Sequence, residues 1–300
     1  MTVSLINTAA RTIGPFEVGP LAFGCWRLTT SVTDDARALV ETALDLGLNL
    51  IDNADVYGFD WGGGGFGANE EVLGAVLASA PSLRERMVLA TKGGIVPPTP
   101  YDSSPLALEA ACDASLRRLQ TDVIDVYQIH RPDLFSHPAD VAATLTRLRE
   151  KGKIREVGVS NHTPAQHEAL AAHLPFPILT TQPEYSPAVL TPLRDGTFDL
   201  CLRDGVVPLA WSPLAGGRLV SGEGIRPELL AVLDDLAERE NVDRAAICLA
   251  FVLAHPSAPV AILGTQTPAR LATAATALGV MLDRADVYAI VQASEGVPLP

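Results

Sequence analysis

The chain has 300 residues, of which 48% are hydrophobic, and this content is enough to bury a large core. A formal net charge of −13 argues against a nucleic-acid partner, because proteins that bind nucleic acids need clustered Lys and Arg. The opening residues lack the apolar core of a signal peptide, and no apolar run reaches the length of about 18 residues that a membrane helix needs. We therefore expect one domain, residues 1–300, in a cytoplasmic protein that has no membrane partner.

From residue 19 onward, short apolar or β-branched runs alternate with longer segments of helical period. This alternation is typical of parallel strands joined by crossover helices, and it is too regular and too β-branched for an α-solenoid. It predicts an α/β fold, a (β/α)8 TIM barrel. The eight expected strands are residues 19–24, 48–52, 87–92, 123–130, 155–160, 178–182, 207–211 and 259–264.

Helix starts are indicated where a capping oxygen precedes a proline or an acidic residue. These signals lie at Thr33, Ser104-Pro105, Thr163-Pro164 and Thr267-Pro268. The segment after the seventh strand is long enough for two helices, 226–241 and 243–255, and a further helix is expected near 283–294. We therefore expect a barrel with extra helices after strand 7 and at the C-terminus.

Several of the expected strands end in a polar or aromatic residue rather than an apolar one. In such a barrel the carboxyl ends of the strands form one rim, where active sites lie. Taken singly, each of these residues is more often a cap, a solvated end or a packing residue, but an acid, an amine, an imidazole and a phenol together form a less ordinary set. They are Asp52, Lys92, His130, Ser160 with Asn161, Gln182 and Trp211, with Tyr57 shortly after the second strand.

Hydride reduction of a carbonyl explains that set, because the oxygen needs a proton donor as it becomes an alkoxide. Tyr57 is the candidate donor, and its ordinary pKa of about 10 would have to fall for the phenolate to form near neutrality. An adjacent Lys92 ammonium favours the phenolate, and Asp52 would hold Lys92. His130 would hydrogen-bond the substrate oxygen or the tyrosine.

These segments also resemble a known family. IDNADVYG (51–58), ATKGG (90–94), YQIHRPD (127–133) and VGVSNH (157–162) are similar, in order and position, to the signatures of aldo-keto reductases. WSPLAGGRL (211–219) and ILGTQTPARL (262–271) extend the resemblance over nearly the whole chain. The resemblance implies a bacterial-type oxidoreductase barrel that binds NADP(H) and uses Asp52, Tyr57, Lys92 and His130 as its catalytic residues.

The resemblance also implies a set of cofactor contacts. Ser160, Asn161 and Gln182 would bind the nicotinamide carboxamide, and Trp211 would stack on the ring. The pyrophosphate would meet Ser212, Leu214 and Gly216, and the adenosine with its 2′-phosphate would meet Thr265 and Arg270. Gly264 and Thr273-Ala274 replace residues that often support that phosphate, so NAD(H) stays an alternative and the preference for NADP rests on Arg270.

A glycine run follows Tyr57, and it formally satisfies GxGxxG at Gly62, Gly64 and Gly67. A Rossmann fingerprint should directly follow a strand, so we interpret the run as a substrate-side loop. Trp26 and Trp61 are the expected apolar walls of the substrate pocket, although core packing explains Trp26 equally well.

We expect an enzyme that moves a hydride between NADP(H) and a small carbonyl, alcohol or sugar substrate, as a monomer or small homo-oligomer. One alternative is an NADP(H)-binding regulatory or sensor barrel with vestigial turnover. A metal-dependent barrel hydrolase is disfavoured, because the first strand lacks an HxH pair. We expect no metal site, since His162 and His167 lie on different faces of their helix and the cysteines are scattered. The sequence leaves the substrate and the direction of the reaction open.

Overall fold

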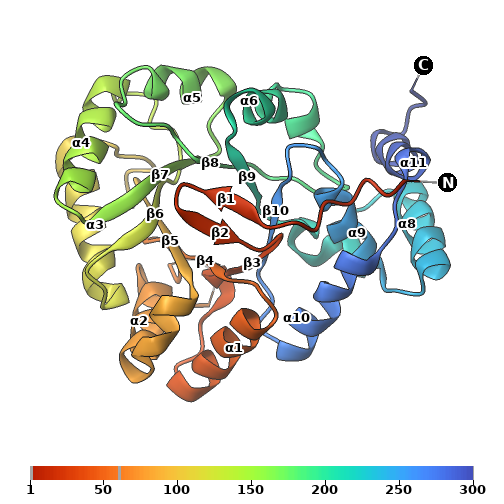
Figure 1. Ribbon diagram of the computed structural model, residues 1–300, viewed down its shortest axis with the longest axis horizontal. Coiled ribbons are helices and arrows are strands. Elements are labelled where there is room, and N and C mark those ends of the chain that lie inside the picture. The colour runs from red at the N-terminus through yellow and green to blue at the C-terminus, as the bar shows by residue number, and fades with distance from the viewer. Residues whose placement is uncertain (1–2, 60–61, 300) are drawn as a thin grey trace.

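The computed structural model describes residues 3–59 and 62–299. Eight parallel strands close into a barrel in the order β10-β3-β4-β5-β6-β7-β8-β9 within this part of the chain (Figure 1). The prediction of a (β/α)8 barrel is confirmed. The strands are β3 (Leu21–Gly24), β4 (Leu50–Asp52), β5 (Val88–Gly93), β6 (Ile124–Ile129), β7 (Ile154–Ser160), β8 (Thr180–Gln182), β9 (Val207–Ala210) and β10 (Val260–Leu263).

Helices surround the barrel on its outside (Figure 1). Those that follow the strands are α1 (Thr33–Asp45), α2 (Ala68–Ser79), α3 (Pro105–Leu119), α4 (Pro138–Glu150), α5 (Pro164–Ala171), α6 (Thr197–Asp204) and α10 (Pro268–Ala274). The predicted extra helices are present as α8 (Pro227–Glu240) and α9 (Arg244–Leu253) after β9, and as α11 (Arg284–Glu295). A further short helix, α7 (Arg218–Ser221), precedes α8.

The predicted helix caps differ in what their side chains do. Ser104 accepts a hydrogen bond from the Ala107 amide at 3.4 Å, and Thr163 forms a capping box with Gln166. Thr267 occupies the N-cap of α10 but makes no capping bond with its side chain. The predicted helix start at Thr33 is confirmed, but its capping role is wrong, because Val32 occupies the N-cap and no side chain caps α1. Two acidic residues in the first turn complement the helix dipole instead.

A short hairpin, β1 (Arg11–Ile13) and β2 (Phe16–Val18), precedes the barrel, and the sequence analysis assigned no element there. Each strand has three residues, too few for an alternating pattern to stand out. Ile13 and Val18 are buried against inward-facing barrel residues such as Leu50 and Leu209. The hairpin therefore covers the amino-terminal end of the barrel, which leaves the opposite end, where the strands finish, for a site.

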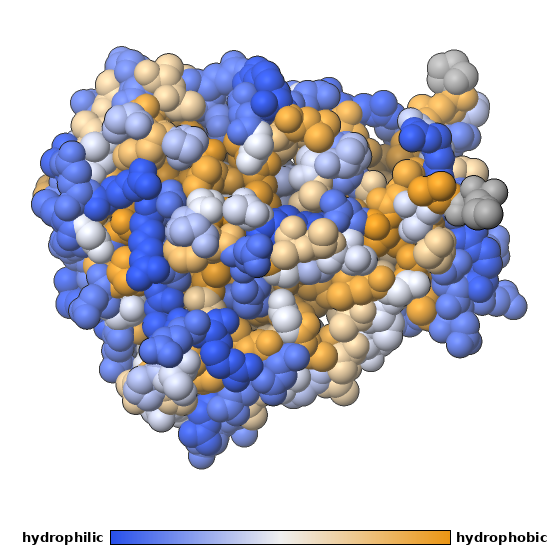
Figure 2. Space-filling view, viewed as in Figure 1, coloured by the Kyte–Doolittle hydropathy of each residue, from blue (hydrophilic) through white to orange (hydrophobic). Residues whose placement is uncertain are grey.

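The hydrophobic core has an inner part inside the barrel and a larger outer part between strands and helices. On the face seen in Figure 2, the outer helices present mainly hydrophilic surface, and apolar patches gather toward the middle. Among the helices in the described ranges, none has both the length and the apolar character needed to cross a membrane.

Candidate active site at the carboxyl ends of the strands

Lys92 forms the centre of a buried polar network at the carboxyl ends of β4 and β5. Its Nζ donates to Asp52 Oδ2 at 2.7 Å, to the backbone oxygen of Asn53 at 2.7 Å and to the Tyr57 hydroxyl at 3.0 Å. The Lys92 side chain is 0% exposed and that of Asp52 is 3% exposed. All three ammonium protons therefore have acceptors, which satisfies a charge that would otherwise be costly to bury.

The second oxygen of Asp52 is held by two side-chain amides. Gln128 Nε2 donates to Asp52 Oδ1 at 3.2 Å, and Gln182 Nε2 donates to the same atom at 3.0 Å. The sequence analysis missed Gln128, although it is a polar residue in an apolar strand, two residues before His130. Because side chains alternate along a strand, that spacing predicts that both side chains lie on the same side of the expected strand 123–130, which could have identified Gln128.

Tyr57 lies in the loop after β4. Burial raises the pKa of its hydroxyl above the ordinary value, and the Lys92 ammonium opposes this rise. The net direction is opposite to the lowering expected from the sequence, because burial outweighs the ammonium. For Lys92, burial alone would lower the pKa, but Asp52 and Tyr57 together raise it above its ordinary value. The site therefore holds a charged ammonium against a phenol that stays protonated near neutral pH.

His130 follows β6, and its ring is set edge-on to Tyr57 with centroids 5.8 Å apart. Its backbone N–H donates to the Gly93 oxygen at 2.9 Å, which fixes the start of this loop. Burial, with Lys92 and Arg131 nearby, lowers the pKa of the imidazole well below its ordinary value. Its buried Nδ1 has no hydrogen-bond partner among the described residues. The structure therefore holds a neutral imidazole beside the Tyr57 ring.

The residues expected to hold the nicotinamide are joined by hydrogen bonds. Asn161 Nδ2 donates to Ser160 Oγ at 2.7 Å, and Trp211 Nε1 donates to Asn161 Oδ1 at 3.0 Å. Ser160 Oγ donates to the Gln182 backbone oxygen at 3.2 Å. Since Gln182 also donates to Asp52, the structure connects this group directly to the buried Lys92 network.

The loop after β9 carries the residues expected at the pyrophosphate. Ser212, Ala215, Gly216 and Gly217 have positive φ values of 50°, 50°, 71° and 103°. The Ala215 and Gly217 N–H groups donate to the Ser212 and Leu214 backbone oxygens at 2.8 and 2.9 Å, so the segment forms a tight turn. Leu214 packs against the outer core.

Thr265 follows the neighbouring strand β10, and Arg270 lies further along, in α10. The Arg270 side chain is exposed and has no ion-pair partner among the described residues. Thr265 therefore lies in the loop after β10, the strand paired with β9, and Arg270 lies in the helix that follows this loop.

Trp26 lies directly after β3, in the short helix η1 (Cys25–Arg27), and the Arg27 guanidinium sits 5.5 Å from its ring centroid. The Asn69 side chain donates to the backbone oxygens of Cys25 and Trp26, at 2.8 and 2.9 Å. This ties the loop after β3 to the start of α2. The other expected pocket wall, Trp61, lies outside the described residues.

The glycine run leads into α2 rather than directly out of a strand. Tyr57 and a turn at Gly58 separate it from β4, and Gly67 caps α2 with a φ of 83°. This arrangement differs from a Rossmann turn, which connects a strand to a helix without an intervening loop.

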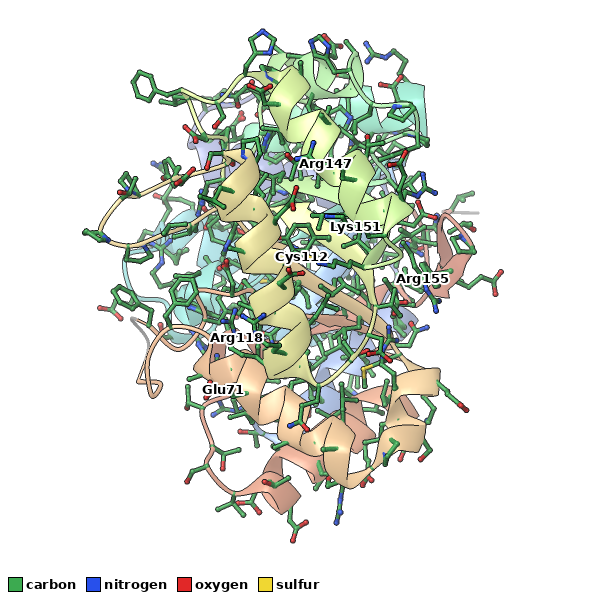
Figure 3. The ribbon with its side chains drawn as sticks, turned by 90° about the vertical axis from the view of Figure 1, so that its left-hand side faces the viewer. Glu71, Cys112, Arg118, Arg147, Lys151 and Arg155 are labelled. Atoms are coloured by element: carbon green, nitrogen blue, oxygen red, sulfur yellow. The ribbon has the colours of Figure 1, made fainter. Side chains whose placement is uncertain are left out.

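A buried ion pair supports the loop that carries Tyr57. Glu70 accepts from Thr91 Oγ1 at 2.5 Å and from Arg118 Nε at 2.7 Å. Figure 3 shows Arg118 projecting from α3 at the level of α2. Asn53 also donates to the Asn69 backbone oxygen at 3.1 Å. The sequence analysis did not single out these residues, because a buried charge pair between two helices leaves no periodic signal.

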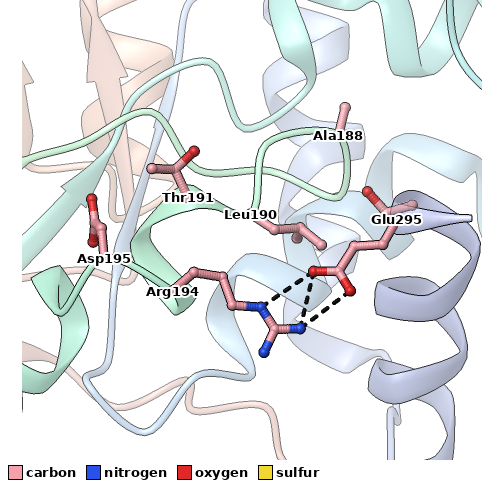
Figure 4. Close-up of a pocket in the computed structure, with 7 residues that line it drawn as sticks. Ala188, Leu190, Thr191, Arg194, Asp195 and Glu295 are labelled. Carbon is pink, nitrogen blue, oxygen red and sulfur yellow. Dashed lines mark hydrogen bonds and ion pairs between the residues drawn. The ribbon is translucent and has the colours of Figure 1, made fainter. Parts of the chain in front are cut away.

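A pocket of about 440 Å³ lies between η3 (Thr191–Leu193) and α11 (Figure 4). Arg194 spans it and donates to Glu295 at 3.0 and 3.2 Å. None of the residues joined to Lys92 lines this pocket. Arg194 and Glu295 satisfy one another, and the third charged residue, Asp195, accepts from the Thr197 amide at 2.9 Å, so we attribute these charges to local packing.

Comparison with known proteins identifies the family. The model of the aldo/keto reductase family matches residues 20–295. A Novosphingobium aromaticivorans protein named 6-dehydroglucose reductase is 48% identical, over 94% of this chain and 94% of its own length. A second protein of that name, from Agrobacterium fabrum, is 34% identical over 89% of this chain and 91% of its own length.

Solved structures agree with the fold. An aldo/keto reductase from Klebsiella pneumoniae, solved in complex with NADP and acetate, matches with a TM-score of 0.80 and 24% identity, over 98% of this chain and 97% of its own. The chain is an oxidoreductase that belongs to the aldo/keto reductase family.

Proposed function

We propose that this enzyme transfers a hydride between NADP(H) and a carbonyl or alcohol group, with Tyr57 as the proton donor and acceptor. The observation that carries the proposal is Lys92, whose buried ammonium reaches Asp52 and the Tyr57 hydroxyl together. When bound, the nicotinamide supplies or accepts the hydride. The side chains position the substrate and donate or accept the proton.

During reduction, the Tyr57 O–H gives its proton to the substrate oxygen, and the Lys92 ammonium stabilises the phenolate that remains. Asp52 keeps Lys92 charged and oriented through the 2.7 Å ion pair. The neutral His130 imidazole has one N–H, which donates to the same substrate oxygen and steers the carbonyl. Oxidation of an alcohol runs through the same groups in reverse.

The residues present fit a nicotinamide cofactor. Gln182 uses Nε2 on Asp52, which leaves Oε1 to accept from a carboxamide N–H. Trp211 is fixed by Asn161 and offers a flat face for stacking. The tight turn after β9 would lie along the pyrophosphate, and Arg270 supplies a cation for a 2′-phosphate. The Klebsiella relative, solved with NADP, supports this assignment.

We propose a sugar-derived aldehyde as the substrate. Two relatives, at 48% and 34% identity, bear the name 6-dehydroglucose reductase. Reduction of such a sugar carbonyl to an alcohol needs the proton donor and hydride described above. We further propose that residues 1–300 act as one domain, in the cytoplasm, as a monomer or small homo-oligomer.

The proposal is tested by mixing purified protein with NADPH or NADH and a panel of sugar aldehydes that includes 6-dehydroglucose, in both reaction directions. We expect NADPH oxidation with sugar aldehydes and quenching of NADPH fluorescence on binding. Tight NADPH binding without turnover of any carbonyl would contradict the enzymatic proposal and favour a sensor.

A further inference from the structure

Arg131 lies beside the proposed catalytic group, directly after His130. Its guanidinium carbon is 5.9 Å from the centroid of the Trp211 ring, and its side chain is half-buried. In the described part of the chain, Arg131 has neither a hydrogen-bonded nor an ion-paired partner for its side chain. A guanidinium carries five N–H donors, so this is a large unused donor group beside the reacting atoms.

Glu184 approaches Trp211 from the loop after β8. Its backbone forms a parallel β-bridge with Trp211, the residue whose ring Arg131 covers. Glu184 and Trp211 are therefore neighbours across the bridge. Glu184 is half-buried, and no side-chain donor within the described residues reaches it. Burial raises the pKa of its carboxyl, while the charges of Arg218 and Arg131 act in the opposite direction.

Arg131 and Glu184 are close enough to influence one another but do not form an ion pair. Other partly buried arginines of this acidic chain do pair, as Arg118 does with Glu70. Both groups lie against Trp211, are half-buried and make no ion pair, so both are open to a polar ligand. Leaving both unpaired when water is displaced would be costly.

The charges of Arg131 and Glu184 indicate which kind of ligand they can bind together. A hydroxyl both donates and accepts, so neighbouring hydroxyls of one molecule can accept from Arg131 and donate to Glu184. A carboxylate would satisfy Arg131 but would be repelled by Glu184. An apolar tail would leave both groups unpaired, which is the situation in which binding sites discriminate most strongly.

Resting on the proposed carbonyl reduction, we propose that Arg131 and Glu184 bind substrate hydroxyls and make the enzyme select polyhydroxylated carbonyls over apolar ones. The two residues determine specificity and take no part in the proton transfer, which belongs to Tyr57.

The test compares glyceraldehyde with propanal, which has the same three-carbon skeleton without hydroxyls, and with the anionic aldehyde succinic semialdehyde. Wild type is expected to prefer glyceraldehyde in kcat/KM. In Arg131→Met, the ratio of glyceraldehyde to propanal should fall about tenfold or more, the scale of one charged hydrogen bond, mainly through KM. Propanal turnover should persist, which shows that the variant folds. Glu184→Gln should raise kcat/KM for succinic semialdehyde relative to glyceraldehyde.

Arg155→Met is the control, because Arg155 also covers an aromatic ring, that of Phe16 at the hairpin end, 5.8 Å away; unlike Arg131 it also pairs with Asp125, at 3.4 Å. It should leave the substrate ratio unchanged. Equal losses on glyceraldehyde and propanal in Arg131→Met, or weaker NADPH fluorescence quenching with an unchanged ratio, would overturn the inference. A wild type that reduces both aldehydes equally well overturns it while the reductase function stands. A wild type that reduces no aldehyde overturns the proposed function and this inference with it.

Discussion

Lys92 is bonded to Asp52 at 2.7 Å inside the barrel wall, where neither side chain is more than 3% exposed. Asp52 ends β4, and Lys92 lies in β5, the strand paired with it. The pair is therefore fixed by the sheet rather than by a loop, and it holds the Tyr57 hydroxyl at one end.

Tyr57→Phe should lower kcat by at least about a hundredfold, because it removes the proton donor. The NADPH dissociation constant, measured by fluorescence, should stay close to that of wild type. Tyr127→Phe is the matched control, since it also removes a buried hydroxyl, one without a partner in the described chain. Near-normal turnover in Tyr57→Phe would show that the proton comes from another group.

Lys92→Met should destabilise the fold by about 3–5 kcal/mol, since it leaves Asp52 as a buried charge without its cation. Urea unfolding monitored by circular dichroism measures this. Lys151→Met serves for comparison, because its ion pair with Glu109, at 3.5 Å, is on the surface, and its loss should cost far less stability than the loss of Lys92. Equal costs for the two variants would contradict the assignment of a buried pair.

Stability should fall as the pH drops from about 6.5, the ordinary histidine value, toward 4. Burial lowers the pKa of both His162 and His255 to about 4. In this window the unfolded chain binds protons at these residues and the folded chain does not, so acid favours unfolding; below pH 4 the effect levels off.

His255→Phe tests this pH dependence. Phenylalanine keeps the stacking on Phe198, where the ring centroids are 4.3 Å apart, but cannot titrate. The free energy of unfolding, measured across this pH window, should lose a slope equivalent to about one proton. Parallel curves for wild type and variant would show that His255 does not titrate as expected.

Arg270→Ala should weaken NADPH binding about tenfold and leave NADH binding unchanged, because only NADPH has a 2′-phosphate to pair with the guanidinium. Arg284→Ala, at an exposed arginine that begins α11, is the control. A similar loss for both cofactors would place Arg270 elsewhere on the adenosine, and no loss would remove it from the site.

The sequence predicted the barrel well because each strand and helix has its own periodicity. It also predicted which strand ends would meet, because parallel strands end at one rim. Asp52, Lys92 and Tyr57 are joined by hydrogen bonds in the structure, as that argument required. Their catalytic roles stay predictions until the variants are measured.

Other features depend on contacts that one segment of sequence does not reveal. The β1–β2 hairpin is too short to show an alternating pattern. Its apolar residues can be recognised as core residues only from their packing against the amino-terminal end of the barrel. The Tyr57 pKa moves upward because burial, a property of the whole fold, exceeds the effect of one neighbouring ammonium. The free donors of Arg131 became visible only when its surroundings were known.

Gln182 joins the two halves of the site, since its amide donates to Asp52 while its backbone accepts from Ser160. A ligand that hydrogen-bonds to the Gln182 amide changes the electrostatic potential at Asp52. Through Lys92, it thereby changes the pKa of Tyr57. Thermodynamic reciprocity then requires that protonation of the network alter the affinity for that ligand by the same factor. Binding and proton release should therefore appear together in calorimetry, as heats that change with the ionisation enthalpy of the buffer.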